Sequence, residues 1–126
     1  MTKFYECLTC GKIIGMIKEG APDTICCGEP MVELTGKDNG EGEIKHVPLV
    51  KEEDGKVYVQ VGEVLHPMLD AHYIDWIYLL TDKGAQRKVL HPGNEPKAIF
   101  YIGENEVVLE VYAHCNIHGL WKAKLD

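Results

Sequence analysis

Short apolar stretches separated by turn residues dominate the second part of the chain. Residues 56–64 read KVYVQVGEV, in which valine alternates with other residues at the period of a strand that buries one face. The preceding EEDG at 52–55 is a turn signal, so residues 46–51 and 56–64 are predicted to form a hairpin. Further stretches rich in β-branched and aromatic residues lie at 72–80, 86–91, 97–102, 106–114 and 119–125.

These stretches predict about seven short strands and no long helix, an arrangement that favours an all-β sandwich. Residues 1–36 differ in composition, because they hold four of the five cysteines and none of the six histidines. Glycine and charged residues fill the stretch GKDNGEGE at 36–43, which predicts a linker. We therefore expect a small domain at 1–36 and a sandwich domain at 37–126.

Charge and cysteine content narrow the function further. The 126-residue chain has a formal net charge of −7 and no basic stripe, which argues against nucleic-acid binding. No apolar run approaches the roughly 20 residues of a membrane span, and the N-terminus lacks the apolar region of a secretory signal. We expect a cytoplasmic protein without a membrane partner. Thiols stay reduced in the cytoplasm, so clustered cysteines there more often bind metals than form disulfides.

Four cysteines form the first candidate metal site. Cys7 and Cys10 belong to a C-x-x-C-G knuckle, and Cys26 and Cys27 are adjacent and followed by glycine. Two such pairs can close a tetrahedral shell of four sulfurs around iron or zinc. The spacing does not decide between the two metals, and buried free cysteines or a disulfide are the alternatives.

The fifth cysteine lies in a second candidate site. Cys115 and His118 are three residues apart, a chelating spacing for a soft thiolate and a neutral imidazole. His66 and His72 flank a predicted turn, which can present both rings to one ion. His114 adjoins Cys115, and neighbours on a strand point to opposite faces, so we leave His114 out. His91 has no cysteine or histidine near it in sequence and is also left out.

At these motifs the chain resembles known families. The cysteine pattern of residues 1–36 is similar to desulforedoxin, a small iron–tetrathiolate protein. The stretches KHVP (45–48), VLHPMLDAHYIDWI (64–77) and CNIHGLWKA (115–123) resemble those of superoxide reductases, in the same order. Over essentially its whole length the chain resembles the desulfoferrodoxins, which are two-iron superoxide reductases.

The resemblance implies an iron at each site. It also implies an immunoglobulin-like sandwich and the reduction of superoxide to hydrogen peroxide by one electron and two protons. Such an activity serves antioxidant defence in an anaerobe or microaerophile. The sixth position of the second iron would be open to substrate. The implied ligands are Cys7, Cys10, Cys26 and Cys27 for the first iron, and His46, His66, His72, His118 and axial Cys115 for the second.

Two residues near His46 are candidate catalytic groups. Lys45 adds positive charge beside the site, which would steer superoxide and help deliver a proton. Superoxide reductases commonly carry glutamate directly before this lysine, where this chain has Ile44. Since Ile44 has no ligand atom, we expect the ferric iron to bind water or hydroxide, or Glu43 after a loop shift. Backbone N–H groups of Asn116 and Ile117 are expected to bond the Cys115 sulfur.

Partners and alternatives follow from the same resemblance. It implies a small electron donor such as a rubredoxin, and a homodimer. An electron-transfer protein with two irons and no superoxide turnover is the main alternative, although electron carriers usually keep full coordination shells. A structural zinc protein is a third hypothesis, but structural zinc sites are four-coordinate. A dismutase differs from a reductase in also oxidising superoxide, so the yield of peroxide separates the two.

Overall fold

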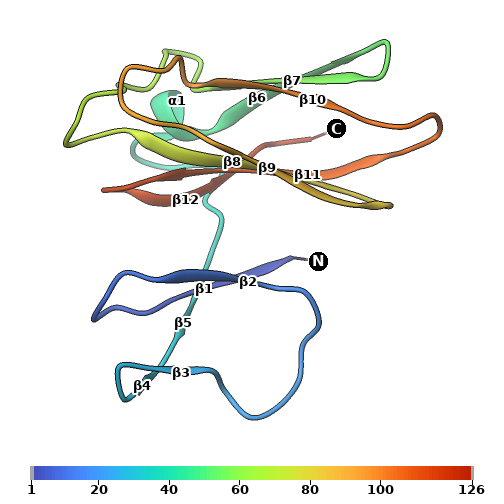
Figure 1. Ribbon diagram of the computed structural model, residues 1–126. Helices are drawn as coiled ribbons and strands as arrows, with labels where there is room; N and C mark the ends of the chain where they lie inside the picture. Colours follow the sequence, from blue (N-terminus) through green and yellow to red (C-terminus); the bar gives the residue numbers. More distant parts are fainter. Residues whose placement is uncertain (1, 126) are drawn as a thin grey trace. The chain divides into compact units, whose positions relative to one another are not determined.

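The computed structural model describes residues 2–125 and has two compact units (Figure 1). The N-terminal unit ends at Thr35 and the C-terminal unit begins at Gly36. Within the described residues both units are built from strands, and one short helix, α1 (Glu43–His46), occurs in the second. The predicted all-β fold is confirmed.

The N-terminal unit consists of very short strands. Its sheet has the order β2-β1-β5, and a separate hairpin pairs β3 with β4. Phe4 and Met31 are its buried apolar side chains, besides Cys7. A unit of this size buries too little apolar surface to be stable without a metal or disulfides. The strands are β1 (Lys3–Glu6), β2 (Ile13–Met16), β3 (Ile25–Cys26), β4 (Glu29–Pro30) and β5 (Val32–Leu34).

Two antiparallel sheets form the C-terminal unit, with the orders β10-β7-β6 and β12-β11-β8-β9. Figure 1 shows them as two stacked layers. These seven strands occupy the seven stretches predicted from the sequence. They are β6 (Pro48–Glu53), β7 (Lys56–Val61), β8 (Ile74–Thr81), β9 (Gly84–Val89), β10 (Lys97–Tyr101), β11 (Val108–Cys115) and β12 (Gly119–Lys122).

The predicted hairpin of β6 and β7 closes with a two-residue turn. Glu53 pairs with Lys56, and the intervening Asp54 and Gly55 have φ values of 50° and 76°. Two successive positive φ values match the twist of the flanking strands, which explains why the sequence there is Asp-Gly.

The core lies between the two sheets. On β7 the alternating residues Val57, Val59 and Val61 are buried, as the valine pattern predicted. The facing strand β11 contributes Val111 and Cys115 to the same core cluster. The fifth cysteine therefore ends a buried strand, and its thiol belongs to the core.

The predicted linker is partly wrong. The backbone of Lys37 forms a parallel bridge with Trp121 of β12, so the first residues of this stretch extend the sheet edge. Gly36 is needed there for close packing, because a Cβ atom would lie 2.9 Å from the ring of Tyr112. The glycine that suggested a free chain instead permits a tight contact. No helix within residues 2–125 is long and apolar enough to cross a membrane.

Candidate metal centres

Two hairpin turns bring the four N-terminal cysteines together. Cys7 follows β1, and its backbone N–H bonds the carbonyl of Lys12 at 2.9 Å. Between β3 and β4, Cys27 and Gly28 are the two central turn residues, with φ values of 52° and 78°. Because this turn places Cys27 in the left-handed region, the adjacent cysteines can converge instead of diverging.

The four sulfurs form a compact cluster, here called the cysteine centre. All four lie within 4.8 Å of one another, and the Cys10 and Cys26 sulfurs are 3.7 Å apart. A hydrogen bond from the Cys10 backbone N–H lowers the pKa of Cys7 to about 6. Interactions with the Cys7 and Cys10 side chains raise the pKa of Cys26 to about 12. Four thiolates would repel one another without a cation, so this donor set fits a tetrahedral metal.

The second cluster, the histidine centre, takes its residues from three connections of the sandwich. His46 ends α1, just before β6, and His66 and His72 lie in the loop between β7 and β8. Cys115 ends β11, and His118 lies in the turn to β12. These segments are far apart in sequence, so only the folded sandwich assembles them.

The four imidazole rings lie at the corners of a square. Centroid distances along its sides are 4.6 Å for both His46–His66 and His66–His72. The other two sides measure 5.0 Å for His72–His118 and 4.9 Å for His118–His46. His46 and His72 are 6.4 Å apart across the diagonal. The rings therefore follow one another around the square in chain order.

Ring nitrogens converge inside the square. The His46 Nε2 atom lies 3.2 Å from His66 Nε2 and 3.2 Å from His118 Nδ1. A metal–nitrogen distance of about 2.0–2.1 Å places neighbouring donors of a square about 3 Å apart. The nitrogen spacing therefore suits a single ion at the centre of the four rings.

Hydrogen bonds fix which nitrogen faces inward. His46 Nδ1 donates to the carbonyl of Gly42 at 2.8 Å, and His66 Nδ1 donates to the carbonyl of Pro67 at 2.6 Å. A carbonyl oxygen only accepts, so the Nε2 lone pairs of these two neutral rings face each other. That arrangement is repulsive unless a cation lies between them.

Burial favours the neutral form of these rings. It lowers the pKa of His46 and of His72, and it lowers the pKa of His66 to about 4. The Nε2 atom of His72 is buried without a hydrogen-bond partner among the described residues. Neutral imidazoles with an unpartnered inward nitrogen fit a metal ion.

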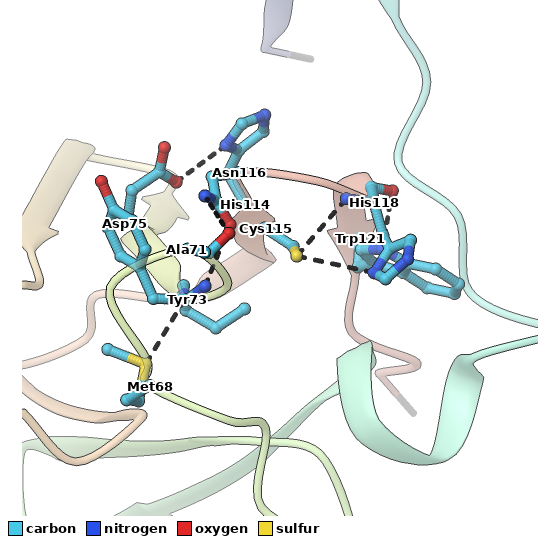
Figure 2. A network of polar contacts seen from close by, with 10 residues as sticks. Met68, Ala71, Tyr73, Asp75, His114, Cys115, Asn116, His118 and Trp121 are labelled. Atoms are coloured by element: carbon cyan, nitrogen blue, oxygen red, sulfur yellow. Dashed lines mark hydrogen bonds and ion pairs between the residues drawn. The ribbon is translucent and has the colours of Figure 1, made fainter. Parts of the chain in front are cut away.

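Cys115 lies on one side of the square. Its side chain is fully buried, and its sulfur is 3.8 Å from His118 Nδ1 (Figure 2). His118 is exposed and His72 is half-buried, so solvent reaches the square at these two corners, here called its solvent side. The backbone N–H of His118 donates to the sulfur at 3.4 Å. The expected Asn116 contact is wrong, because the Asn116 N–H donates to the carbonyl of Tyr73.

The two histidines left out of the site lie elsewhere. His114 points to the opposite face of β11, where its Nδ1 lies 2.7 Å from Asp75 Oδ1 (Figure 2). The backbone N–H of His91 donates to Asn94 Oδ1 in a turn. Neither residue belongs to a cluster of potential metal ligands in the described chain.

Lys45 and Glu43 flank the histidine centre on α1. Lys45 is exposed, and its positive charge helps to lower the pKa of His72 after burial and His118. The Glu43 carboxylate lies 3.0 Å from Lys124 Nζ. Ile44 between them is 55% exposed. All three residues lie in the single helical turn of α1.

Family comparisons agree with this architecture. The description "Desulfoferrodoxin, N-terminal domain" matches residues 1–34, and "Desulfoferrodoxin" matches residues 38–124. The chain belongs to the desulfoferrodoxin family. Two groups of potential ligands lie close enough together to hold a metal ion, namely the four cysteines and the set of His46, His66, His72 and Cys115. His118 is outside the second group, although its Nδ1 atom lies 3.2 Å from His46 Nε2.

Relatives and solved structures cover nearly the whole desulfoferrodoxin chain. A desulfoferrodoxin homolog of Archaeoglobus fulgidus is 45% identical over 119 residues, 94% of each chain. The desulfoferrodoxin of Nitratidesulfovibrio vulgaris is 39% identical and covers 97% of this chain and 95% of its own. The crystal structure of the superoxide reductase from Treponema pallidum has a TM-score of 0.81 at 31% identity, covering 98% of both chains.

Proposed function

We propose that this chain is a superoxide reductase that converts superoxide to hydrogen peroxide at iron held by the histidine centre. One observation carries the proposal: four imidazoles form a square, a buried thiol lies against it, and two of its corners meet solvent. An iron ion held by these five donors would have a sixth coordination position free for a small substrate. The likeness to the Treponema pallidum superoxide reductase over 98% of both chains supports it.

The donor set favours iron over zinc at the histidine centre. Structural zinc is four-coordinate and catalytic zinc usually has three protein ligands, whereas five donors converge here. Bound iron would supply the single electron that superoxide takes up. The proposed ligands are His46, His66, His72, His118 and Cys115, with Cys7, Cys10, Cys26 and Cys27 holding a second iron in the cysteine centre.

Lys45 is the proposed residue for attracting the substrate. Superoxide is an anion and the chain carries a net charge of −7, so a local positive charge must overcome long-range repulsion. The exposed Lys45 ammonium acts on His72 at the solvent side of the square. From there it can steer superoxide and pass a proton through water.

Glu43 is a proposed ligand of the oxidised iron that must first leave its ion pair with Lys124. Its carboxylate pairs with Lys124, so it can approach the histidine centre only if that ion pair opens. The side chain of Ile44 offers no donor atom in its place. We propose that, in the oxidised protein, a protein group binds the iron at the solvent side only when the Glu43 carboxylate moves there. The variant Glu43→Gln then leaves the anion affinity of the reduced protein unchanged and alters that of the oxidised protein.

An external electron donor completes the proposed cycle, since each superoxide consumes one electron and two protons. Exposed aliphatic side chains lie within two residues of proposed ligands in sequence: Ile44, Leu65 and Ile117 are 55%, 46% and 57% exposed. Exposed apolar side chains near the centre suit brief docking of a small redox protein of the rubredoxin type. We further propose a cytoplasmic homodimer. Fractionation and sedimentation of the iron-loaded protein test location and assembly.

The deciding experiment measures hydrogen peroxide formed per superoxide consumed by the reduced, iron-loaded protein with excess reductant. A reductase gives a ratio near one, because every superoxide becomes peroxide. A ratio near one half means dismutation. No acceleration over buffer leaves a two-iron electron-transfer protein and overturns the proposal. The variant Cys115→Ser is the matched control for activity at the histidine centre.

A further inference from the structure

Trp121 contacts two corners of the histidine square. Its indole ring stacks on the His46 imidazole at a centroid distance of 4.7 Å and an interplanar angle of 21°. Its Nε1–H donates to the carbonyl oxygen of His118 at 3.2 Å (Figure 2). The side chain is 2% exposed, so packing fixes its orientation. Trp121 of β12 thus contacts both His46 and His118, which come from different parts of the chain.

Lys37 reaches the same point from the segment that precedes α1. Its Nζ atom donates to the His118 carbonyl at 2.9 Å and lies 4.6 Å from the centroid of the Trp121 ring. Backbone hydrogen bonds hold Lys37 in place, because its N–H donates to Leu120 and its carbonyl accepts from Lys122. The lysine is therefore anchored on both sides of Trp121, although its side chain is exposed.

The carbonyl of His118 is thereby held by two donors, an indole and an ammonium. This carbonyl belongs to the residue whose N–H donates to the Cys115 sulfur and whose Nδ1 faces the square. Fixing it restricts the turn that carries both potential ligands. Outer partners of this kind orient metal ligands, and their loss typically lowers metal affinity or activity about 10- to 100-fold.

Lys37 also brings a charge. Its ammonium nitrogen lies 2.9 Å from the carbonyl oxygen of His118, a residue whose Nδ1 atom faces the square. A cation beside a metal favours the oxidation state of lower positive charge, which for iron is the ferrous state. The presence of Lys37 should therefore raise the reduction potential of the histidine centre.

We propose that Lys37 and Trp121 are positioning residues of the histidine centre, and that Lys37 in addition raises its reduction potential. The indole holds the His46 ring from one side, and the two donors hold the His118 turn. The inference rests on iron occupying the histidine centre, as in the proposed function, but it does not require that superoxide be the substrate.

The test compares iron-loaded Lys37→Met, Lys37→Arg and Trp121→Phe with the parent chain. Two quantities are measured: the reduction potential, followed through thiolate–iron absorption, and the rate at which a chelator removes iron from the histidine centre. Lys51→Met is the control, since Lys51 is an exposed lysine on β6 that pairs with Glu53.

We expect Lys37→Met to lower the potential and to speed iron loss about tenfold, at the lower end of outer-partner effects. Lys37→Arg should keep the reduction potential of the parent chain, because arginine carries the same positive charge. Trp121→Phe keeps the potential but speeds iron loss, because the ring remains and the donor is gone. The proposal is overturned if Lys37→Met matches Lys51→Met in both quantities. It is also overturned if Lys37→Met changes only the unfolding midpoint.

These outcomes are separable from failure of the proposed function. If the parent chain does not accelerate superoxide loss but Lys37→Met still lowers the potential, the positioning role stands and the reductase does not. If peroxide forms at a ratio near one and Lys37→Met changes neither quantity, the reductase stands and the positioning role fails. Should Trp121→Phe fail to fold, the exposed Lys37 variants decide alone.

Discussion

The two metal centres are built in opposite ways. Both pairs of cysteines in the cysteine centre come from tight turns within a 21-residue stretch, between strands of two to four residues. In the histidine centre, His46 and His118 are 72 positions apart and meet only when α1 reaches the β11–β12 turn. The first centre organises its own surroundings, whereas the second is organised by a completed sandwich.

The potential ligands of the cysteine centre are also more exposed to solvent than those buried in the histidine centre. Cys10 and Cys27 are exposed, while Cys115 and His66 are 0% and 2% exposed. A local, exposed thiolate cluster depends on its metal for stability, because few apolar contacts support it. A buried centre on a large core draws its geometry from packing, so it can hold five donors and still leave one side to solvent. The cysteine centre is therefore expected to lose its structure without a metal, whereas the sandwich around the histidine centre is expected to remain folded.

The largest expected effect separates the two centres by their thiols. We expect Cys115→Ser to reduce the rate of superoxide reduction by more than about 100-fold, beyond the range of outer-partner changes. The iron of the cysteine centre remains. Cys10→Ser should do the reverse, losing that iron while the histidine centre keeps its activity. Iron content and peroxide yield are measured for both variants. Loss of both irons in either variant would show that the two centres are not independent of each other.

A core substitution should damage one unit alone. Ile77 is fully buried between the sheets, so Ile77→Ala should lower the free energy of unfolding of the sandwich by about 2–5 kcal/mol. Both tryptophans lie in this unit, at positions 76 and 121, so urea unfolding followed by tryptophan fluorescence reports on it. The exposed Ile25→Ala in the N-terminal unit is the control. If Ile77→Ala makes the cysteine centre lose its thiolate–iron absorption at the same urea concentration at which the sandwich unfolds, the two units are not independent.

A smaller effect is expected from the charge at the solvent side. Lys45→Met should slow the second-order reaction with superoxide about tenfold and flatten its dependence on ionic strength, because electrostatic steering is lost. Lys45→Arg should keep most of the rate if attraction is the main role. Stopped-flow measurements at several salt concentrations test this. An unchanged rate for Lys45→Met removes the lysine from the proposed mechanism.

The smallest effect concerns pH in the metal-free protein. The pKa of His66 is about 4 in the folded chain, below its usual 6.5, and those of His46 and His72 are also lowered. Between these values the unfolded chain binds more protons, so stability is full above pH 6.5 and falls towards pH 4. The urea midpoint by tryptophan fluorescence should decline over that range. A flat profile would mean that the square opens without its metal.

The strands were predictable because their signal is local. Alternating valines and an Asp-Gly turn define β6 and β7 within a few residues, and no distant contact is needed to recognise them. The motif around Cys115 was equally local, since a chelating spacing of three residues is visible in the sequence. These features depend on backbone periodicity, which the sequence carries directly.

What depends on three-dimensional packing was not predictable. Trp121 is buried, and nothing in its neighbourhood in the sequence indicates that its ring stacks on His46. The sequence predicts the N–H groups of Asn116 and Ile117 as donors to the Cys115 sulfur. The turn directs the Asn116 N–H to the carbonyl of Tyr73, and the N–H of His118 donates to the sulfur. In both cases the turn geometry and packing, and not the residue type, select the partner.

Burial of Cys115 has a consequence for damage by oxidants. A peroxide formed on the solvent side of the imidazole square has no direct path to the sulfur, which is fully shielded by the core. Thiols are oxidised in proportion to their exposure and thiolate character, and the higher oxidation states are irreversible. The exposed Cys10 and Cys27 lack this shield. If the proposed function holds, peroxide would therefore oxidise the cysteine centre before it oxidises Cys115.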